Sequence, residues 1–275
     1  MNSHNQPLIS VYLPTRNRAG LVREAVATVQ KQSYEQWELI VVNDASDDDT
    51  QAVVDRLAQN DSRIRVLHQP KPQGAPAARN RAIAEAQGMW ITGIDDDDRW
   101  HPDRLMHLYD SFAEGFSAVC SYDVMVDGNR RRVWKKPPVI DLDDLLYYNR
   151  VGNQVLTKTE NLRAIGGFDE ALPAAQDYDC WIRLVEAHGP IKTVPESLQE
   201  VAIGATDDRI TNSERRLAGY RRCFEKHHDK MSVAHRRYQQ YRLKLASGER
   251  LSLLHAFRAS PPKLWFKELK RMLQT

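Results

Sequence analysis

Four consecutive aspartates, Asp95, Asp96, Asp97 and Asp98, carry the strongest chemical signal in the sequence. We call them the aspartate run, and they directly follow the apolar segment 89–94. Two carboxylates about 6 Å apart repel each other by roughly 3 kcal/mol at an effective dielectric constant of about 20. A divalent cation would remove this repulsion, and carboxylate oxygens suit Mg²⁺ or Mn²⁺ held together with substrate phosphates. The aspartate run is therefore a candidate metal site, with a solvated acidic turn or a helix cap as the alternative.

Three further polar residues have side chains suited to related chemistry. Asp44 ends an apolar run, where its carboxylate could accept a hydrogen bond from a base or a ribose; an Asx turn with Ser46 is the alternative. Arg79 could face a diphosphate, or it could be an ordinary surface arginine. Asp177 lies in the segment QDYDCW and could act as a general base. The alternative for Asp177 is a helix cap, with Trp181 packed in the core.

An alternation of apolar strand patterns and amphipathic helix patterns positions these residues. Strands are predicted over 8–14, 37–42, 63–68 and 89–94, and helices over 19–32, 46–60 and 75–86, with Ser46 as a cap. Short loops between them predict a doubly wound, largely parallel sheet. Ligands bind beyond the carboxyl ends of the strands in such sheets. Residues 15–17, residues 43–44 and the aspartate run should therefore gather at one edge.

The second half of the chain is less regular. A hairpin is predicted from strands 117–126 and 131–135 across the turn 127–129. The further helices are predicted over 141–148, 160–165 and 177–188, and the further strands over 154–158 and 191–194. From about residue 213 the chain is expected to be mostly helical.

Composition and charge describe a globular protein with two unlike parts. The 275 residues are 41% hydrophobic and 28% charged, with a net charge of +2, which excludes a disordered or fibrous chain. We expect no transmembrane helix and no signal peptide, and the three widely spaced cysteines favour a reducing compartment. Residues 214–275 have a net charge of +11, and the rest of the chain has −9. The two parts should therefore have different partners.

The basic tail ends in an amphipathic pattern over residues 263–273. The apolar face would carry Trp265, Leu269, Met272 and Leu273, and another face would carry Lys263, Lys267 and Lys270. This pattern is typical of a helix that lies in a membrane interface. The alternative is that the apolar stripe packs back on the protein. His227 and His228 lack metal-ligand spacing and are expected at the surface.

Four segments in one order resemble the family-2 inverting glycosyltransferases. They are ISVYLPTRNR, ELIVVNDASDDDT, GAPAARNRAIAEAQGMWITGIDDDDRWHPDRL and IGGFDEALPAAQDYDCWIRL. The resemblance covers roughly residues 8–215. It implies an α/β fold of the GT-A type, with a Rossmann-like, mainly parallel central sheet flanked by helices and a basic helical C-terminal extension. Residues 1–212 would form the transferase domain, with a nucleotide-sugar-binding half (1–100) and an acceptor-binding half (101–212), and residues 213–275 the basic helical region.

Roles in this family transfer to matching positions of the sequence. The resemblance implies that Asp95 and Asp97 form the D-x-D metal pair, that Asp177 is the catalytic base, and that Asp179 and Trp181 contact the acceptor. The implied nucleotide-sugar contacts are Pro14, Thr15, Arg16, Asn17, Asp44, Arg79, Asp96 and Arg209. Asp44 matches the position that contacts uracil, and Arg209 stands where the family often has a histidine. One departure is Gln176, where the family usually has a glutamate.

The activity implied by the resemblance is metal-assisted, inverting transfer of a sugar from a nucleotide-diphosphate donor, UDP before GDP or dTDP. The acceptor would be a hydroxyl of a glycan or lipid-linked molecule in bacterial surface polysaccharide synthesis. Mg²⁺ or Mn²⁺ would be the cofactor, and no nucleic acid would be a partner. The location would be cytoplasmic, with residues 263–273 as a peripheral contact with the inner membrane face. Two alternatives remain: a sugar-phosphate nucleotidylyltransferase, and a non-enzymatic module that binds metal or nucleic acid.

Overall fold

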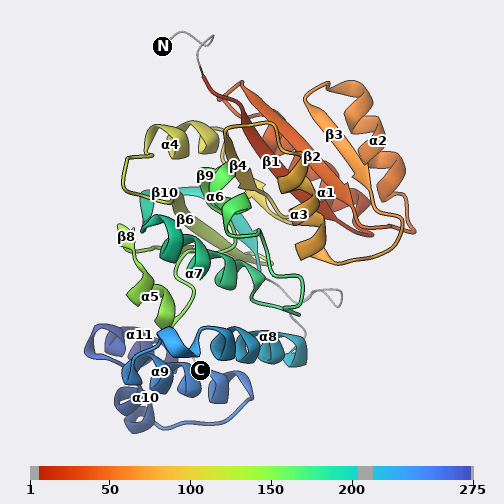
Figure 1. The fold of residues 1–275 in the computed structure, drawn as a ribbon. Coiled ribbons are helices and arrows are strands. Elements are labelled where there is room, and N and C mark those ends of the chain that lie inside the picture. The colour runs from red at the N-terminus through yellow and green to blue at the C-terminus, as the bar shows by residue number, and fades with distance from the viewer. Residues whose placement is uncertain (1–5, 204–212, 274–275) are drawn as a thin grey trace.

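A mixed sheet runs through the molecule (Figure 1). The computed structural model describes residues 6–203 and 213–273. Its strands are β1 (Ile9–Thr15), β2 (Trp37–Asn43), β3 (Ile64–His68), β4 (Trp90–Gly93), β5 (Arg99–Trp100), β6 (Ala118–Asp127), β7 (Arg130–Trp134), β8 (Val139–Ile140), β9 (Leu156–Lys158) and β10 (Ile191–Ala202). Along the sheet they follow the order β3-β2-β1-β4-β9-β6-β10-β5, with β7 paired to β6 and β8 to β10.

The first four strands are parallel, as the sequence predicts. Strand β1 pairs with β2 on one side and with β4 on the other, and β2 pairs with β3. All seven residues of β1 are buried, because the sheet is covered on both faces. Parallel strands bring their carboxyl ends to one edge. The ends of β1, β2 and β4 therefore lie side by side, with the aspartate run following β4.

The second half adds strands of both directions. Strand β9 is antiparallel to β4 and to β6, and β10 runs parallel to β6 with shifts in register near Ser197. Strands β6 and β7 form the predicted hairpin. Irregular pairing of this kind leaves no simple periodic pattern in the sequence. The bounds predicted for the strands in this half are therefore less exact.

Helices cover both faces of the sheet. The helices are α1 (Ala19–Gln30), α2 (Thr50–Asn60), α3 (Ala75–Glu85), α4 (Arg104–Asp110), α5 (Leu142–Tyr147), α6 (Thr159–Ala164), α7 (Gln176–His188), α8 (Ser213–Lys226), α9 (Val233–Ala246), α10 (Leu253–Ala259) and α11 (Trp265–Met272). One buried cluster joins β1 to α1, α2 and α4. A second, on the other face, joins the sheet to α3, α5, α6 and α7. Apolar burial on both faces is the main stabilising term for such a layered fold.

The predicted cap of the second helix is wrong. Helix α2 begins at Thr50, and Ser46 does not cap it. The Ser46 hydroxyl donates to Asn43 Oδ1 at 2.5 Å and accepts from the Asn17 backbone N–H at 2.9 Å. Ser46 therefore ties together the loops after β1 and β2, and the left-handed backbone at Ala45 (φ 53°) makes that turn.

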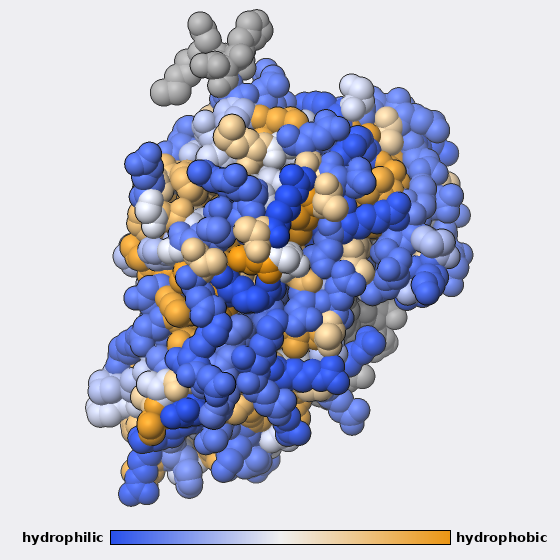
Figure 2. All heavy atoms as spheres, viewed as in Figure 1, coloured by the Kyte–Doolittle hydropathy of each residue, from blue (hydrophilic) through white to orange (hydrophobic). Residues whose placement is uncertain are grey.

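The C-terminal region is helical and packs beside α5 and α7 (Figure 1). A third buried cluster includes Tyr147 from α5, Tyr238 and Tyr241 from α9, and Leu264. Figure 2 shows the face of the whole molecule that is turned to the viewer in Figure 1. This face is mostly hydrophilic, with apolar residues in separate groups. Among the described residues, none of the helices combines the length and apolar character needed to cross a membrane.

Candidate active site

The carboxyl ends of β1, β2 and β4 open into a cleft of about 780 Å³, which we call the donor cleft. Many of the residues expected to share a site line it. These are Pro14, Thr15, Arg16, Asn17, Asp44, Arg79, Asp95, Asp96, Asp97 and Asp98. The structure therefore brings together three segments that are far apart in the sequence, at the edge where a parallel sheet binds ligands.

Asp44 organises the wall of the donor cleft. Its buried carboxylate accepts hydrogen bonds from the backbone N–H of Gln73 at 2.7 Å and of Gly74 at 2.8 Å. The Gln69 side chain donates a third bond at 2.8 Å. A carboxylate has about four acceptor positions, so Asp44 can hold this loop and still accept a bond from a ligand.

The aspartate run alternates between buried and half-buried side chains. Asp96 and Asp98 point inward, whereas the side chains of Asp95 and Asp97 are 24% and 19% exposed. Burial raises the pKa of Asp96 to about 6, although Arg18 beside it acts in the opposite direction. Burial and the charges of Asp95 and Asp97 raise the pKa of Asp98 well above its usual value. Negative charge is thus crowded at the end of β4.

Two arginines offset part of this charge. Arg79 Nη2 lies 2.8 Å from Asp95 Oδ1. Arg18 Nη1 lies 2.9 Å from Asp96 Oδ1 and 3.2 Å from Asp97 Oδ2. Sequence reasoning missed Arg18, because an arginine just before a helix looks like an ordinary surface residue.

The donor set fits a divalent cation that also binds a ligand. Asp95 and Asp97 present half-exposed carboxylates to the donor cleft, and oxygen ligands suit Mg²⁺ or Mn²⁺. No cluster of three or more His, Cys, Asp or Glu side chains arranged to hold a metal occurs within residues 6–203 and 213–273. A cation here would therefore complete its coordination with phosphate oxygens and water, as Mg²⁺ usually does.

Asp177 lies in the first turn of α7, next to but not in the lining of the donor cleft. Burial raises its pKa to about 6, and the nearby charges of Arg79 and Asp95 act on it with opposite signs. Asn149 Nδ2 donates to its Oδ2 at 3.1 Å. The carboxylate of Asp177 is thus half-buried, oriented by an amide, and within electrostatic reach of two residues that line the donor cleft.

Residues 149–154, which we call the bridging segment, connect the two acidic regions. At one end Asn149 donates to Asp177. At the other, Asn153 Nδ2 lies 3.0 Å from Asp95 Oδ2 and 2.6 Å from Asp98 Oδ2. This segment was not predicted from the sequence. The signal that could have revealed it is the cluster of three amide side chains in NRVGNQ.

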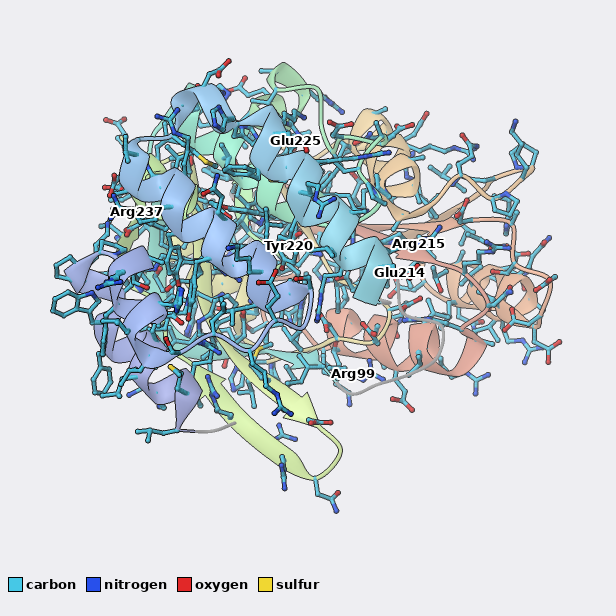
Figure 3. All side chains as sticks on the ribbon, turned by 90° about the horizontal axis from the view of Figure 1, so that it is seen from below. Arg99, Glu214, Arg215, Tyr220, Glu225 and Arg237 are labelled. Atoms are coloured by element: carbon cyan, nitrogen blue, oxygen red, sulfur yellow. The ribbon has the colours of Figure 1, made fainter. Side chains whose placement is uncertain are left out.

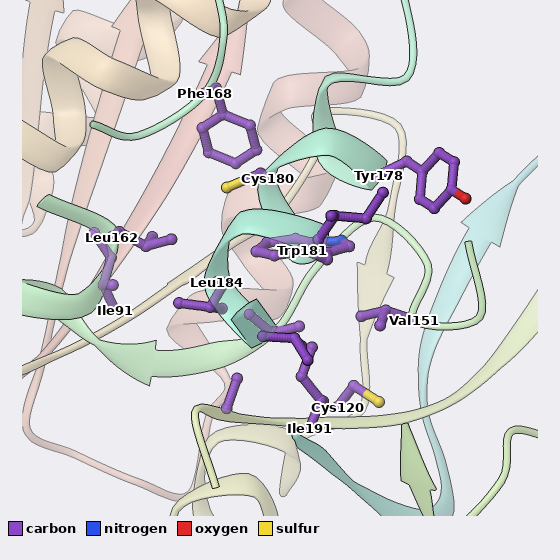
Figure 4. Packing of buried hydrophobic residues seen from close by; sticks show 14 of the residues in the cluster. Ile91, Cys120, Val151, Leu162, Phe168, Tyr178, Cys180, Trp181, Leu184 and Ile191 are labelled. Atoms are coloured by element: carbon purple, nitrogen blue, oxygen red, sulfur yellow. The ribbon is translucent and has the colours of Figure 1, made fainter. Parts of the chain in front are cut away.

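The expectation that Trp181 contacts the acceptor is wrong. Its side chain is fully buried, and its Nε1–H donates to the Gly152 carbonyl at 2.9 Å. Figure 4 shows it within the apolar cluster, with Phe168 and Leu184 close by. Trp181 therefore lies in the core and holds the bridging segment through Gly152. A core position was the alternative that the sequence analysis gave for this residue.

The same expectation is wrong for Asp179. This fully buried carboxylate lies 2.8 Å from Arg183 Nη2, 2.9 Å from Lys226 Nζ and 2.8 Å from His227 Nε2. Although burial raises the pKa of Asp179, the bonds from His227, Lys226 and Arg183 outweigh burial and hold it well below its usual value. His227 was expected at the surface but is 1% exposed. Asp179 therefore joins α7 to α8.

Helix α8 also reaches the donor cleft. Arg215 lines it, and Figure 3 shows this residue at the N-terminal end of α8. Sequence reasoning missed Arg215, because it assigned the basic region to other partners. Arg209, expected at the diphosphate, lies outside the described residues.

Comparison with known proteins agrees with this geometry. Residues 10–168 match the family described as Glycosyl transferase family 2. A protein of Escherichia coli (strain K12) named as a colanic acid biosynthesis glycosyl transferase is 37% identical over 258 residues, which covers 90% of this chain and 91% of that protein.

Solved structures share the fold. A mannosyltransferase from Pyrobaculum calidifontis, in complex with GDP-Man and Mn²⁺, superposes with a TM-score of 0.68 at 20% identity, covering 99% of this chain and 81% of that one. Residues 1–349 of TarS from S. aureus, in complex with UDP-GlcNAc, superpose with a TM-score of 0.64 at 18% identity, covering 83% of this chain and 69% of that one. These likenesses confirm the predicted α/β, GT-A-type fold.

Proposed function

Since the chain belongs to glycosyltransferase family 2, we propose that it moves a hexosyl or N-acetylhexosaminyl group from a nucleotide-diphosphate donor to a hydroxyl of a glycan or lipid-linked acceptor. The pathway we propose is bacterial surface polysaccharide synthesis, as the name of the E. coli relative suggests. The observation that carries the proposal is that the aspartate run and Arg79 line one cleft at the carboxyl edge of the sheet, with Asp177 close enough for Arg79 and Asp95 to act on its pKa. Family membership favours transfer over the nucleotidylyltransferase and the binding-module alternatives.

Asp95 and Asp97 would hold the cation, with Asp97 as the direct ligand. A bound Mg²⁺ or Mn²⁺ would neutralise the charge that develops on the leaving diphosphate. The Mn²⁺ in the P. calidifontis complex supports a cation of this kind. Asp98 stays inward, where Asn153 and Gln199 donate to it at 2.6 and 3.1 Å.

The nucleotide would lie along the loops after β1 and β2. We assign its base to the wall held by Asp44 and its ribose to Asp96. Pro14, Thr15, Arg16 and Asn17 line the same part of the donor cleft. UDP is our first choice of nucleotide, supported by the TarS complex with UDP-GlcNAc.

Asp177 would act as the general base. Its raised pKa, about 6, makes the carboxylate a stronger base than an exposed aspartate while leaving it ionised at neutral pH. It would take the proton from the acceptor hydroxyl as that oxygen bonds to the anomeric carbon and the bond from this carbon to the diphosphate oxygen breaks. One displacement from the opposite face inverts the stereochemistry.

The substitution Asp177→Asn tests this assignment. It keeps the shape of the side chain and removes its basicity, so kcat should fall by about 10²–10⁴-fold while donor affinity is unchanged. Release of the nucleotide measures turnover, and calorimetry measures donor binding. Asp143→Asn is the matched control, because Asp143 is an exposed carboxylate that pairs with Lys263 away from the donor cleft. Near-normal turnover in the Asp177 variant would remove it as the base.

The donor itself can be identified by thermal shift. At equal concentration, UDP-, GDP- and dTDP-sugars, each with Mn²⁺ or Mg²⁺, should raise the melting temperature more the more tightly they bind. We expect the largest shift from a UDP-sugar, and only when the metal is present. A metal-independent shift of equal size would contradict the role given to Asp95 and Asp97.

We also propose that residues 263–273 of a cytoplasmic enzyme contact the membrane surface. Helix α11 packs with one side on the protein, through Glu268 and Met272. It leaves Trp265, Phe266 and Leu273 at least 44% exposed. One side of this helix therefore packs on the protein, and the other side is free to contact a membrane. These are the two interpretations that the sequence allowed for the tail. Phe266→Ser with Leu273→Ser should weaken binding to vesicles without unfolding the protein.

A further inference from the structure

A second cleft, of about 960 Å³, lies among α8, α9 and α11, and we call it the basic cleft. Its lining includes four arginines, Arg216, Arg242, Arg250 and Arg271, and one lysine, Lys267. The lining carboxylates are those of Glu249 and Glu268. Positive charge therefore exceeds negative charge in the wall of this cleft.

The carboxylates neutralise only part of this positive charge. Glu268 is buried and accepts from Tyr238 at 2.7 Å, from Tyr241 at 2.9 Å and from Arg271 Nε at 3.0 Å. Among the described residues, Arg216, Arg242 and Arg250 have no carboxylate within 4.0 Å. Three arginines thus face the basic cleft without an ion-pair partner there.

Aromatic rings hold the cations of the innermost wall in place. Lys267 Nζ lies 3.0 Å from the centre of the Tyr148 ring. The Arg242 guanidinium lies 5.2 Å from the same ring and 5.9 Å from that of Tyr220. Burial and the neighbouring charge of Arg242 lower the pKa of Lys267 to about 6. Lys267 is therefore mostly neutral at pH 7, and an anion bound beside it and Arg242 would favour its protonated form.

Helix α8 separates the basic cleft from the donor cleft. Arg215 lines the donor cleft, whereas Arg216 and Tyr220 line the basic cleft, and Figure 3 shows Arg215 and Tyr220 along this helix. Burial raises the pKa of Tyr220, Arg242 lowers it, and the charge of Asp177 adds to the rise. Asp177 is therefore within electrostatic reach of both clefts.

Exposed apolar side chains neighbour the lining residues of α11 in the sequence. Lys267 and Met272 line the cleft, and Phe266 and Leu273, directly next to them in the sequence, are 78% and 79% exposed. A ligand that joins an anionic group to hydrocarbon would match both surfaces. Arginine is suited to phosphate oxygens because its planar fork donates two parallel hydrogen bonds.

We propose that the basic cleft binds the phosphate group of a membrane lipid, with the lipid chains against Phe266 and Leu273. Binding itself is independent of the proposed function. That the lipid carries the acceptor sugar, which would then approach Asp177 from the side of α8, rests on that function.

Flotation of the full chain with vesicles tests the proposal. The vesicles are phosphatidylcholine alone, or phosphatidylcholine with phosphatidylglycerol, and no donor is present. The test variant combines Arg216→Glu and Arg250→Glu, both at exposed positions in the cleft wall. The control combines Arg221→Glu and Arg237→Glu, which change the charge equally at exposed positions that line neither cleft.

We expect the wild type to float with the phosphatidylglycerol vesicles. The test variant should bind at least about tenfold more weakly, and the control should change by less than about threefold. Equal losses in the two variants would show general charge attraction and overturn the cleft, as would no binding by the wild type. If inorganic pyrophosphate bound the cleft as tightly as the vesicles do and released the protein from them, the cleft would be a site for a soluble phosphate. That result would overturn the proposal of a lipid ligand. Nucleotide-sugar turnover, measured separately, reports whether the proposed function has failed.

Discussion

The donor cleft and the basic cleft lie on either side of α8 and carry opposite excesses of charge. At the end of β4, carboxylates crowd together and Arg18 and Arg79 neutralise part of their charge. In the basic cleft, arginines crowd together and Glu268 pairs with Arg271. Each arrangement is electrostatically incomplete, so each gains most from a ligand of opposite sign: a cation with phosphates in one, a phosphate in the other. The split between −9 and +11 along the chain thus corresponds to two binding surfaces.

Among the changes considered, Asp97→Ala in the donor cleft should have the largest effect, and this effect is on nucleotide binding. Removal of the proposed direct metal ligand is expected to abolish metal-dependent nucleotide binding, measured by calorimetry of UDP with and without Mn²⁺. Arg250→Glu in the basic cleft should leave that binding unchanged. Retained metal-dependent binding in the Asp97 variant would place the cation elsewhere.

Asp179→Ala tests the contact that joins the two regions. The change leaves Arg183, Lys226 and His227 without their buried partner, so the free energy of unfolding should fall by about 3–5 kcal/mol. Asp169→Ala is the matched control, because that half-buried carboxylate also pairs with Lys226 and its loss should cost about 0–1 kcal/mol. Urea unfolding measures the free energy of unfolding of both variants. Equal decreases in the two would show that Asp179 is no more important for stability than Asp169.

The pH dependence of kcat at saturating donor tests Asp177 apart from Asp96, whose pKa is also raised to about 6 but which is proposed to act in donor binding. Asp177 accepts a proton only as a carboxylate, and its pKa is raised to about 6. Turnover should therefore be constant above about pH 7 and fall about tenfold per pH unit below 6. Asp177→Asn should lose this dependence as well as the rate. A wild-type profile that stays flat down to pH 5 would contradict the assignment.

The smallest expected effect is in the basic cleft. The pKa of Lys267 is lowered from 10.5 to about 6, so the folded protein favours the neutral amine and loses stability as the pH falls from about 10 to 6. Lys267→Met removes this cost and should raise the free energy of unfolding by about 1–2 kcal/mol at pH 7. The gain should vanish near pH 10. The exposed Lys270→Met is the control, and we expect no change from it.

The first half of the fold followed from the sequence because its signals are local. Buried parallel strands such as β1 and β2 are continuous apolar runs, and the polar residues after them mark the ligand edge. This placed Asp44, Arg79 and the aspartate run correctly in one cleft. Which oxygens touch which ligand stays a prediction.

What the sequence did not reveal depends on distant partners. His227 looked like a surface residue because its partner, Asp179, lies 48 positions away. Arg18 and Asn153 are unremarkable among their neighbours, and only folding brings them to the carboxylates. Trp181 was ambiguous, since an aromatic residue on a helix near a catalytic position is equally compatible with the core.

The bridging segment has a consequence for timing. It contacts Asp177 through Asn149, and Asp95 and Asp98 through Asn153, so the positions of the two ends are linked through one short segment. We expect that when a cation and donor bind at Asp95, a shift of Asn153 would be passed along this segment to the Asn149 amide that orients Asp177. We expect alignment of the base to follow arrival of the donor, which would keep an empty enzyme from activating water and would limit wasteful breakdown of the donor.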